Sequence, residues 1–136
     1  MNKTSFCIEA ELGRLPEISC LIRAFFSDNG FDEKFCGQID IVVEEIFVNI
    51  ASYAYPDGGS KDVIVECGVE DDTALLVFKD HGVPYDPLGK KDPVIGDPKG
   101  MTIGGYGIFM VKQIMDEVSY RYDETTRQNI LTMRKK

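Results

Sequence analysis

Two polar side chains one helical turn apart offer the first candidate chemistry. Glu45 and Asn49 are four positions apart in a segment whose apolar residues follow helical spacing, so both stand on one helix face. The amide oxygen of Asn49 suits a hard cation such as Mg²⁺, and the carboxylate of Glu45 can take a proton from a nucleophile. An exposed polar pair on an amphipathic helix explains the same spacing, so the pair alone is a weak signal.

A polar turn follows the dense apolar run 74–78 and offers a second candidate. Asp80 at the end of a strand can accept a hydrogen bond from a ligand amine, and Gly82, which has no Cβ, allows close approach of the backbone to that ligand. An ordinary turn has the same composition, because Asp, Gly and Pro are common turn residues. His81 lacks a catalytic partner nearby in the sequence and is expected to be a loop residue.

Glycines precede a helix that the apolar spacing predicts from Ile108. Gly104, Gly105 and Gly107 would expose backbone N–H groups at the helix N-terminus, where the helix dipole favours an anion such as phosphate. A flexible hinge is the alternative interpretation. The segment matches neither the Walker pattern nor the dinucleotide fingerprint, so it is also ambiguous alone.

The elements that must position these residues follow from hydrophobic periodicity and turn residues. We expect strands near 4–9, 63–69, 74–78, 118–122 and 129–133, and helices near 18–26, 33–55 and 108–115. The stretch 88–101 has hardly any periodicity and is expected to be a mobile, functional loop. This order predicts one α+β domain over 1–136, a two-layer sandwich with a mixed, mostly antiparallel sheet and three helices on one face.

Composition excludes several classes of protein. The 136 residues include 15 Lys plus Arg and 23 Asp plus Glu, a net charge of −8, without the clustered cationic face that nucleic-acid binding needs. No apolar run reaches the length of a membrane span, and residues 1–10 do not resemble a signal peptide, so we expect a cytoplasmic protein. Four cysteines without a CxxC pair and a single His disfavour a disulfide framework or a metal cluster. How so acidic a chain would hold an anionic ligand is left open.

In chain order, the motifs resemble the nucleotide site of the GHKL ATPases, which share the Bergerat, or histidine kinase-like ATPase, fold: Glu45-x-x-x-Asn49, Asp80-x-Gly82-x-Pro84 and Gly105-x-Gly107. The small size and the run from Gly104 to Val118 resemble the anti-sigma-factor serine kinases of bacterial partner-switching systems. The resemblance covers about residues 3–135. Two positions depart from it: Tyr106 stands where the family often has Leu, and Asn129 where it commonly has Thr.

The resemblance implies ATP and Mg²⁺ as ligands. Asn49 would coordinate Mg²⁺, Asp80 would bind the adenine amine, and Gly82 would allow close packing of the base. The phosphates would lie on backbone N–H groups contributed by the glycines that open the last helix: Gly104, Gly105 and Gly107.

The same resemblance implies a catalytic residue and a lid. Glu45 would be the general base that activates a serine hydroxyl of a substrate protein, and residues 88–103 would form the ATP lid. Lys90, Lys91 and Lys99 are the lid cations that the sequence offers for the phosphates.

The leading hypothesis is therefore an ATP-dependent serine protein kinase that acts as an anti-sigma regulatory factor. It would phosphorylate a STAS-domain anti-anti-sigma protein, sequester a sigma factor and form a homodimer. The alternative is a non-catalytic module in which ATP or ADP switches protein partners. A third hypothesis, an adaptor domain without nucleotide, predicts no stabilisation by Mg-ADP. A sensor histidine kinase is disfavoured because 136 residues leave no room for a dimerisation helix pair.

Overall fold

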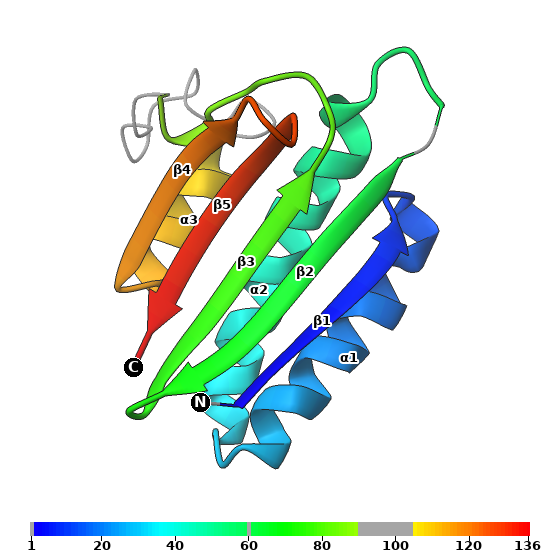
Figure 1. Cartoon of the computed structure of the whole chain (residues 1–136). Helices are drawn as coiled ribbons and strands as arrows, with labels where there is room; N and C mark the ends of the chain where they lie inside the picture. The colour runs from blue at the N-terminus through cyan, green and yellow to red at the C-terminus, as the bar shows by residue number, and fades with distance from the viewer. Residues whose placement is uncertain (1, 60, 90–104) are drawn as a thin grey trace.

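One antiparallel sheet with helices on one face forms the fold (Figure 1). The computed structural model describes residues 2–59, 61–89 and 105–136. Its five strands pair in the order β1-β2-β3-β5-β4, and each of these pairings is antiparallel. The strands are β1 (Asn2–Glu9), β2 (Asp62–Glu70), β3 (Thr73–Asp80), β4 (Glu117–Asp123) and β5 (Gln128–Lys135). The predicted α+β class is confirmed.

The main helices among the described residues are α1 (Leu15–Asp28), α2 (Glu33–Asn49) and α3 (Gly105–Ile114). Short 3-10 segments, η1 (Leu12–Arg14) and η3 (Pro87–Gly89), lie in the connections. The predicted single helix over 33–55 is divided, because the chain leaves the α form after Asn49 and continues as the π-helical segment η2 (Ile50–Ala54). None of the described helices is long and apolar enough to span a membrane.

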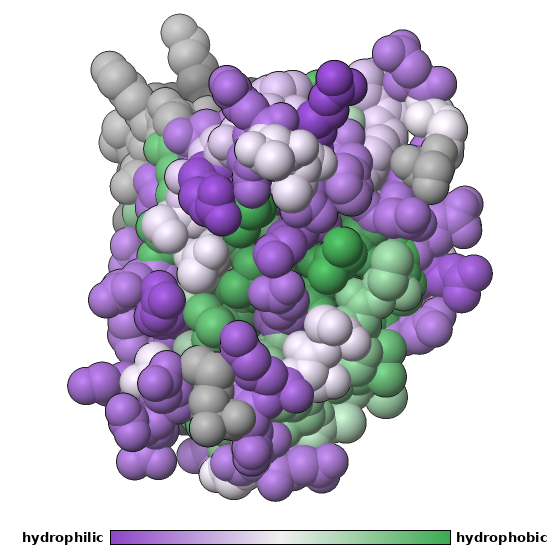
Figure 2. Space-filling model, in the orientation of Figure 1, coloured by the Kyte–Doolittle hydropathy of each residue, from purple (hydrophilic) through white to green (hydrophobic). Residues whose placement is uncertain are grey.

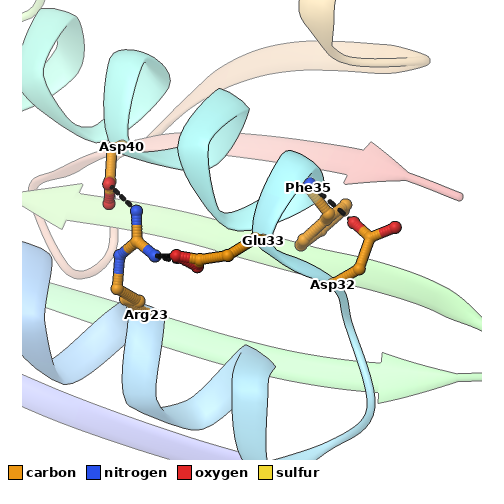
Figure 3. A network of polar contacts seen from close by, with 5 residues as sticks. All are labelled: Arg23, Asp32, Glu33, Phe35 and Asp40. Carbon is orange, nitrogen blue, oxygen red and sulfur yellow. Dashed lines mark hydrogen bonds and ion pairs between the residues drawn. The ribbon is translucent and has the colours of Figure 1, made fainter.

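A capping residue marks the start of α2, and a network of ion pairs joins α2 to α1 (Figure 3). Asp32 caps α2 by accepting a hydrogen bond from the backbone N–H of Phe35 at 2.8 Å. Arg23 of α1 donates to both carboxylate oxygens of Glu33 at 2.7 Å and also pairs with Asp40 of α2. Because Glu33 is exposed and both Arg23 and Asp40 remain partly accessible to solvent, we expect these ion pairs to orient the two helices more than to add stability.

The core lies between the sheet and the helices. Alternate residues of β2 and β3 point into it, including Val63, Val65, Leu76 and Phe78, each at most 1% exposed. The face that the helices leave open is also partly apolar, and Figure 2 shows apolar surface between polar residues over its middle strands. On this open face of β3, Val77 is only 5% exposed, whereas Leu75 and Lys79 are half-buried.

Candidate functional site

A cavity of about 380 Å³ lies where the end of α2, the segment η2 and the end of β3 meet strands β4 and β5. Asn49 and Asp80, two of the predicted site residues, line it. Its wall also contains side chains that the sequence did not assign to a site: Tyr53, Phe78, Tyr85, Ile108, Tyr120, Asn129 and Leu131. A mainly apolar cavity with a few polar groups is typical of a small-molecule site.

Asp80 is the last residue of β3 and is only 6% exposed. Its Oδ1 accepts hydrogen bonds from the backbone N–H of Gly82 at 2.9 Å and from Asn129 Nδ2 at 3.0 Å. Burial raises the pKa of this carboxyl group, and the two hydrogen bonds oppose the rise. Neither of these hydrogen bonds uses Oδ2, so this oxygen can accept a hydrogen bond from a ligand in the cavity.

Gly82 packs against another part of the chain, the backbone of Ala54 in η2. A Cβ at this position would lie 2.3 Å from the carbonyl oxygen of Ala54 and 2.6 Å from its Cβ. That same carbonyl accepts a hydrogen bond from the N–H of Val83 at 2.9 Å. The glycine therefore lets the turn after β3 pack on η2, the segment that follows Asn49, and the fold requires it whether or not a ligand binds.

Glu45 and Gly107 meet where α2 packs against α3. A Cβ at Gly107 would lie 2.2 Å from Glu45 Oε2, so the first turn of α3 has room for the carboxylate only because residue 107 is a glycine. Burial raises the pKa of Glu45, and the neighbouring Glu44 raises it further. A carboxylate with a raised pKa is a stronger base than usual, which suits proton abstraction.

The remaining predicted residues divide between described and undescribed parts of the chain. Gly105 and Gly107 lie in the first three residues of α3, as expected. Gly104 and most of the predicted lid at 88–103, including all three of its lysines, lie outside the described residues. His81 is an exposed loop residue, as predicted, whose N–H donates to the hydroxyl of Tyr55 at 2.9 Å.

Two functional candidates, Tyr120 and Asn129, were missed as site residues. Asn129 is 7% exposed and lies directly across from Asp80 in the β3–β5 register. Its sequence signal was an amide at an inward-facing position of an alternating strand, but only the strand pairing identifies the neighbour. Tyr120 of β4 donates a hydrogen bond from its hydroxyl to Asn129 Oδ1.

The described residues contain no cluster of three or more His, Cys, Asp or Glu side chains that could hold a metal ion. A divalent cation here would need ligands from a bound phosphate and water in addition to the amide oxygen of Asn49. Mg²⁺ tolerates such a site, because it retains several waters and commonly binds through substrate phosphates. The residues present therefore fit a magnesium-bound nucleotide better than a free metal ion.

The sequence model of a protein family, the histidine kinase-like ATPase domain, matches residues 8–135, so the chain belongs to this family. Its relatives include the serine-protein kinases RsbW of Listeria innocua serovar 6a and of Listeria monocytogenes serotype 4a. Each is 29% identical over an alignment of 118 positions, and the match covers 83% of this chain and 72% of the relative. The resemblance inferred from the three motifs is confirmed.

Two solved structures share the fold. The structure of the RsbU and RsbW domains of Rv1364c from Mycobacterium tuberculosis matches with a TM-score of 0.71 and 13% identity. The match covers all of this chain, which spans 32% of that chain. The SiaB-SiaC complex from Pseudomonas aeruginosa matches with a TM-score of 0.63 and 14% identity, over 97% of this chain and 88% of that one.

Proposed function

We propose that this protein is an ATP-dependent serine protein kinase that acts as an anti-sigma regulatory factor. Its substrate would be a STAS-domain anti-anti-sigma protein, and its second partner a sigma factor. The observation that carries the proposal is the position of Glu45. It contacts the first turn of α3 and lies one helical turn before Asn49, which lines the cavity. The serine-protein kinases among its relatives support the same activity.

Each part of the site has a role in this reaction. Asp80 would accept a hydrogen bond from the adenine amine, and backbone N–H groups at the start of α3 would hold the phosphates. Asn49 would hold Mg²⁺, which when bound neutralises charge on the phosphates. The acidic chain would thus hold an anionic ligand without a cluster of basic side chains.

Glu45 would act on the substrate serine. Its carboxylate would accept the hydroxyl proton while the serine oxygen forms a bond to the γ-phosphorus. The bond between that phosphorus and the β–γ bridging oxygen breaks, and ADP leaves with the electron pair. The raised pKa of Glu45 favours this proton transfer.

The proposal is tested by incubating the protein with Mg-ATP and a matched STAS-domain protein, and by measuring phosphoserine on that protein. Glu45→Gln should lower transfer by about 10²- to 10⁴-fold, while the Kd for ADP should change much less. Glu44→Gln, at the exposed neighbour on the same helix, is the comparison variant: it removes only the smaller contribution to the raised pKa of Glu45, so it should lower transfer far less. Transfer by Glu45→Gln at the wild-type rate would refute the role of Glu45.

One observation favours the alternative, a non-catalytic module in which ATP or ADP switches protein partners. Glu45 is not among the residues that line the cavity. Under this alternative the protein binds Mg-ADP and changes its affinity for a partner with the nucleotide state, but gives no phosphoserine with any matched partner. Partner binding measured with ATP and with ADP, beside the transfer assay, separates the two functions.

The partner proposals can be tested independently of transfer. A net charge of −8 favours a basic partner, and a sigma factor, which binds DNA, is of that class. The open, partly apolar sheet face is where a second copy of the chain would pack (Figure 2). Sedimentation equilibrium would measure the homodimer, and co-purification from the cytoplasm would identify the sigma factor.

A further inference from the structure

The side-chain amide of Asn129 is held in one orientation by backbone groups. Its Nδ2 donates to the carbonyl oxygen of Val83 at 3.0 Å, and its Oδ1 accepts from the N–H of Tyr85 at 3.1 Å. A carbonyl can only accept and a backbone N–H can only donate, so exchanging the oxygen and nitrogen of the amide would break both contacts. The identity of each Asn129 atom is therefore determined by the main chain.

This orientation determines which hydrogen bonds the carboxyl group of Asp80 accepts. Because Asn129 Nδ2 must donate, the Asp80 Oδ1 that it meets at 3.0 Å must accept. The N–H of Gly82 donates to the same oxygen at 2.9 Å. These two donors stabilise the carboxylate against the burial that raises the pKa of Asp80, and because both of them bind Oδ1, Oδ2 is left to the cavity as the acceptor.

Tyr120 completes the arrangement from the neighbouring strand. Asn129 Oδ1 can only accept, so the Tyr120 hydroxyl must donate to it. Tyr120 and Asn129 both line the cavity, yet the hydroxyl of Tyr120 and the amide of Asn129 form their hydrogen bonds with other groups of the protein. Their influence on a ligand would therefore pass through Asp80.

We infer that Asn129, held by Tyr120, is a positioning residue that makes the cavity select a 6-amino purine over a 6-oxo purine. The inference rests on the proposed nucleotide binding and adds how its base is chosen. An acceptor at Asp80 Oδ2 pairs with an exocyclic amine, whereas it faces the oxygen of a 6-oxo purine without a proton between them. Leaving two acceptors unpaired in a buried site costs affinity, and this cost is the source of the selectivity.

The test measures the Kd values of ADP and of inosine diphosphate, whose bases differ at position 6. Wild-type protein should bind ADP at least about tenfold more tightly. Tyr120→Phe keeps the ring on the cavity wall and removes the hydroxyl, so the preference should fall about threefold to tenfold. Tyr122→Phe is the matched control, because Tyr122 is a half-buried tyrosine of β4 outside the cavity lining, and its preference should equal that of the wild type.

Asn129→Asp is the stronger variant. It keeps the shape of the side chain but places a second carboxyl group against Asp80, and one of the two must then carry a proton. That proton can be offered to a 6-oxo group, so the preference for ADP should fall by about tenfold or more, with inosine diphosphate binding at least as well as before. If this variant does not fold, Tyr120→Phe alone decides the matter.

The outcomes separate this inference from the proposed function. A reduced preference in Tyr120→Phe or in Asn129→Asp supports a positioning role. Equal weakening of both nucleotides, with the preference unchanged, would mean that the residues only maintain the fold and would overturn the inference while nucleotide binding stands. Wild-type protein that binds neither nucleotide would overturn the proposed function and the inference together.

Discussion

The carboxylate of Glu45 lies against Gly107 so closely that a Cβ on residue 107 would sit 2.2 Å from Glu45 Oε2. This contact joins two motifs that are 62 positions apart in the sequence. It places the proposed general base at the helix turn that would hold the phosphates. The position of Glu45 and the identity of residue 107 are therefore coupled.

We predict that Gly107→Ala lowers phosphoryl transfer at least about tenfold, because the added methyl group displaces Glu45 from the start of α3. The fold should survive, since the obstructing atom is the end of a flexible side chain. Stopped-time assays of phosphoserine formation measure the effect. Gly37→Ala is the control, because Gly37 lies within α2 with open space around it and alanine favours a helix. Wild-type transfer by Gly107→Ala would contradict the coupling.

Gly82→Ala should be the more damaging glycine substitution. Its methyl group would meet the carbonyl oxygen of Ala54 at 2.3 Å, and backbone cannot rotate away as a side chain can. We expect the free energy of unfolding to fall by about 1–3 kcal/mol, with weaker ADP binding, because the turn beside Asp80 must shift. Urea denaturation measures the stability. Gly13→Ala, at a position with open space, should change it far less.

ADP binding should weaken as the pH is lowered from 7. Burial raises the pKa of Asp80, so its ionised form, which accepts the adenine amine, is lost at a higher pH than for an ordinary aspartate. ADP titrations between pH 7 and pH 5 should give a steeper loss for the wild type than for Asp80→Asn, because the titration of the phosphates is common to both. Parallel curves would contradict a role for the Asp80 charge.

Lowering the pH should have the opposite effect on the stability of the ligand-free protein, because protonation of Asp80 favours the folded state. The raised pKa means that the folded state binds a proton more tightly than the unfolded state. The stabilisation from this group is complete below the unfolded pKa and is lost as the pH rises through the folded pKa. Asp80→Asn should therefore flatten this part of the curve of unfolding free energy against pH, as measured by urea denaturation at each pH.

Alkylation should distinguish two classes of cysteine. Cys7 and Cys20 are exposed, whereas Cys36 and Cys67 are buried, and burial raises the pKa of Cys67 to about 12. Since the thiolate is the reactive form, iodoacetamide should add to two thiols of the folded protein and to all four after denaturation. Intact-mass spectrometry counts the adducts. Four rapid adducts on the folded protein would show that the core opens readily.

Much of the fold could be predicted because its signals are local. The strands and α1 were found within a few residues, since apolar alternation and helical spacing report which face of a segment is buried. The end of α2 was misplaced at residue 55, because the apolar spacing continues past Asn49 while the hydrogen-bond pattern changes to that of a π-helix. Spacing records which side chains are buried and is insensitive to such a change.

The order of the elements, the α+β class and the types of residue that could hold a nucleotide could all be inferred from the amino-acid sequence, since they depend on neighbours along the chain. The folded chain was needed to show that Asn129 lies across from Asp80, that Gly82 leaves room for Ala54 and that Gly107 leaves room for Glu45. These pairs depend on the register between β3 and β5, on the packing of α2 against α3 and on the turn that folds back onto η2. Such long-range contacts are set by the packing of the whole chain, which no short run of residues specifies.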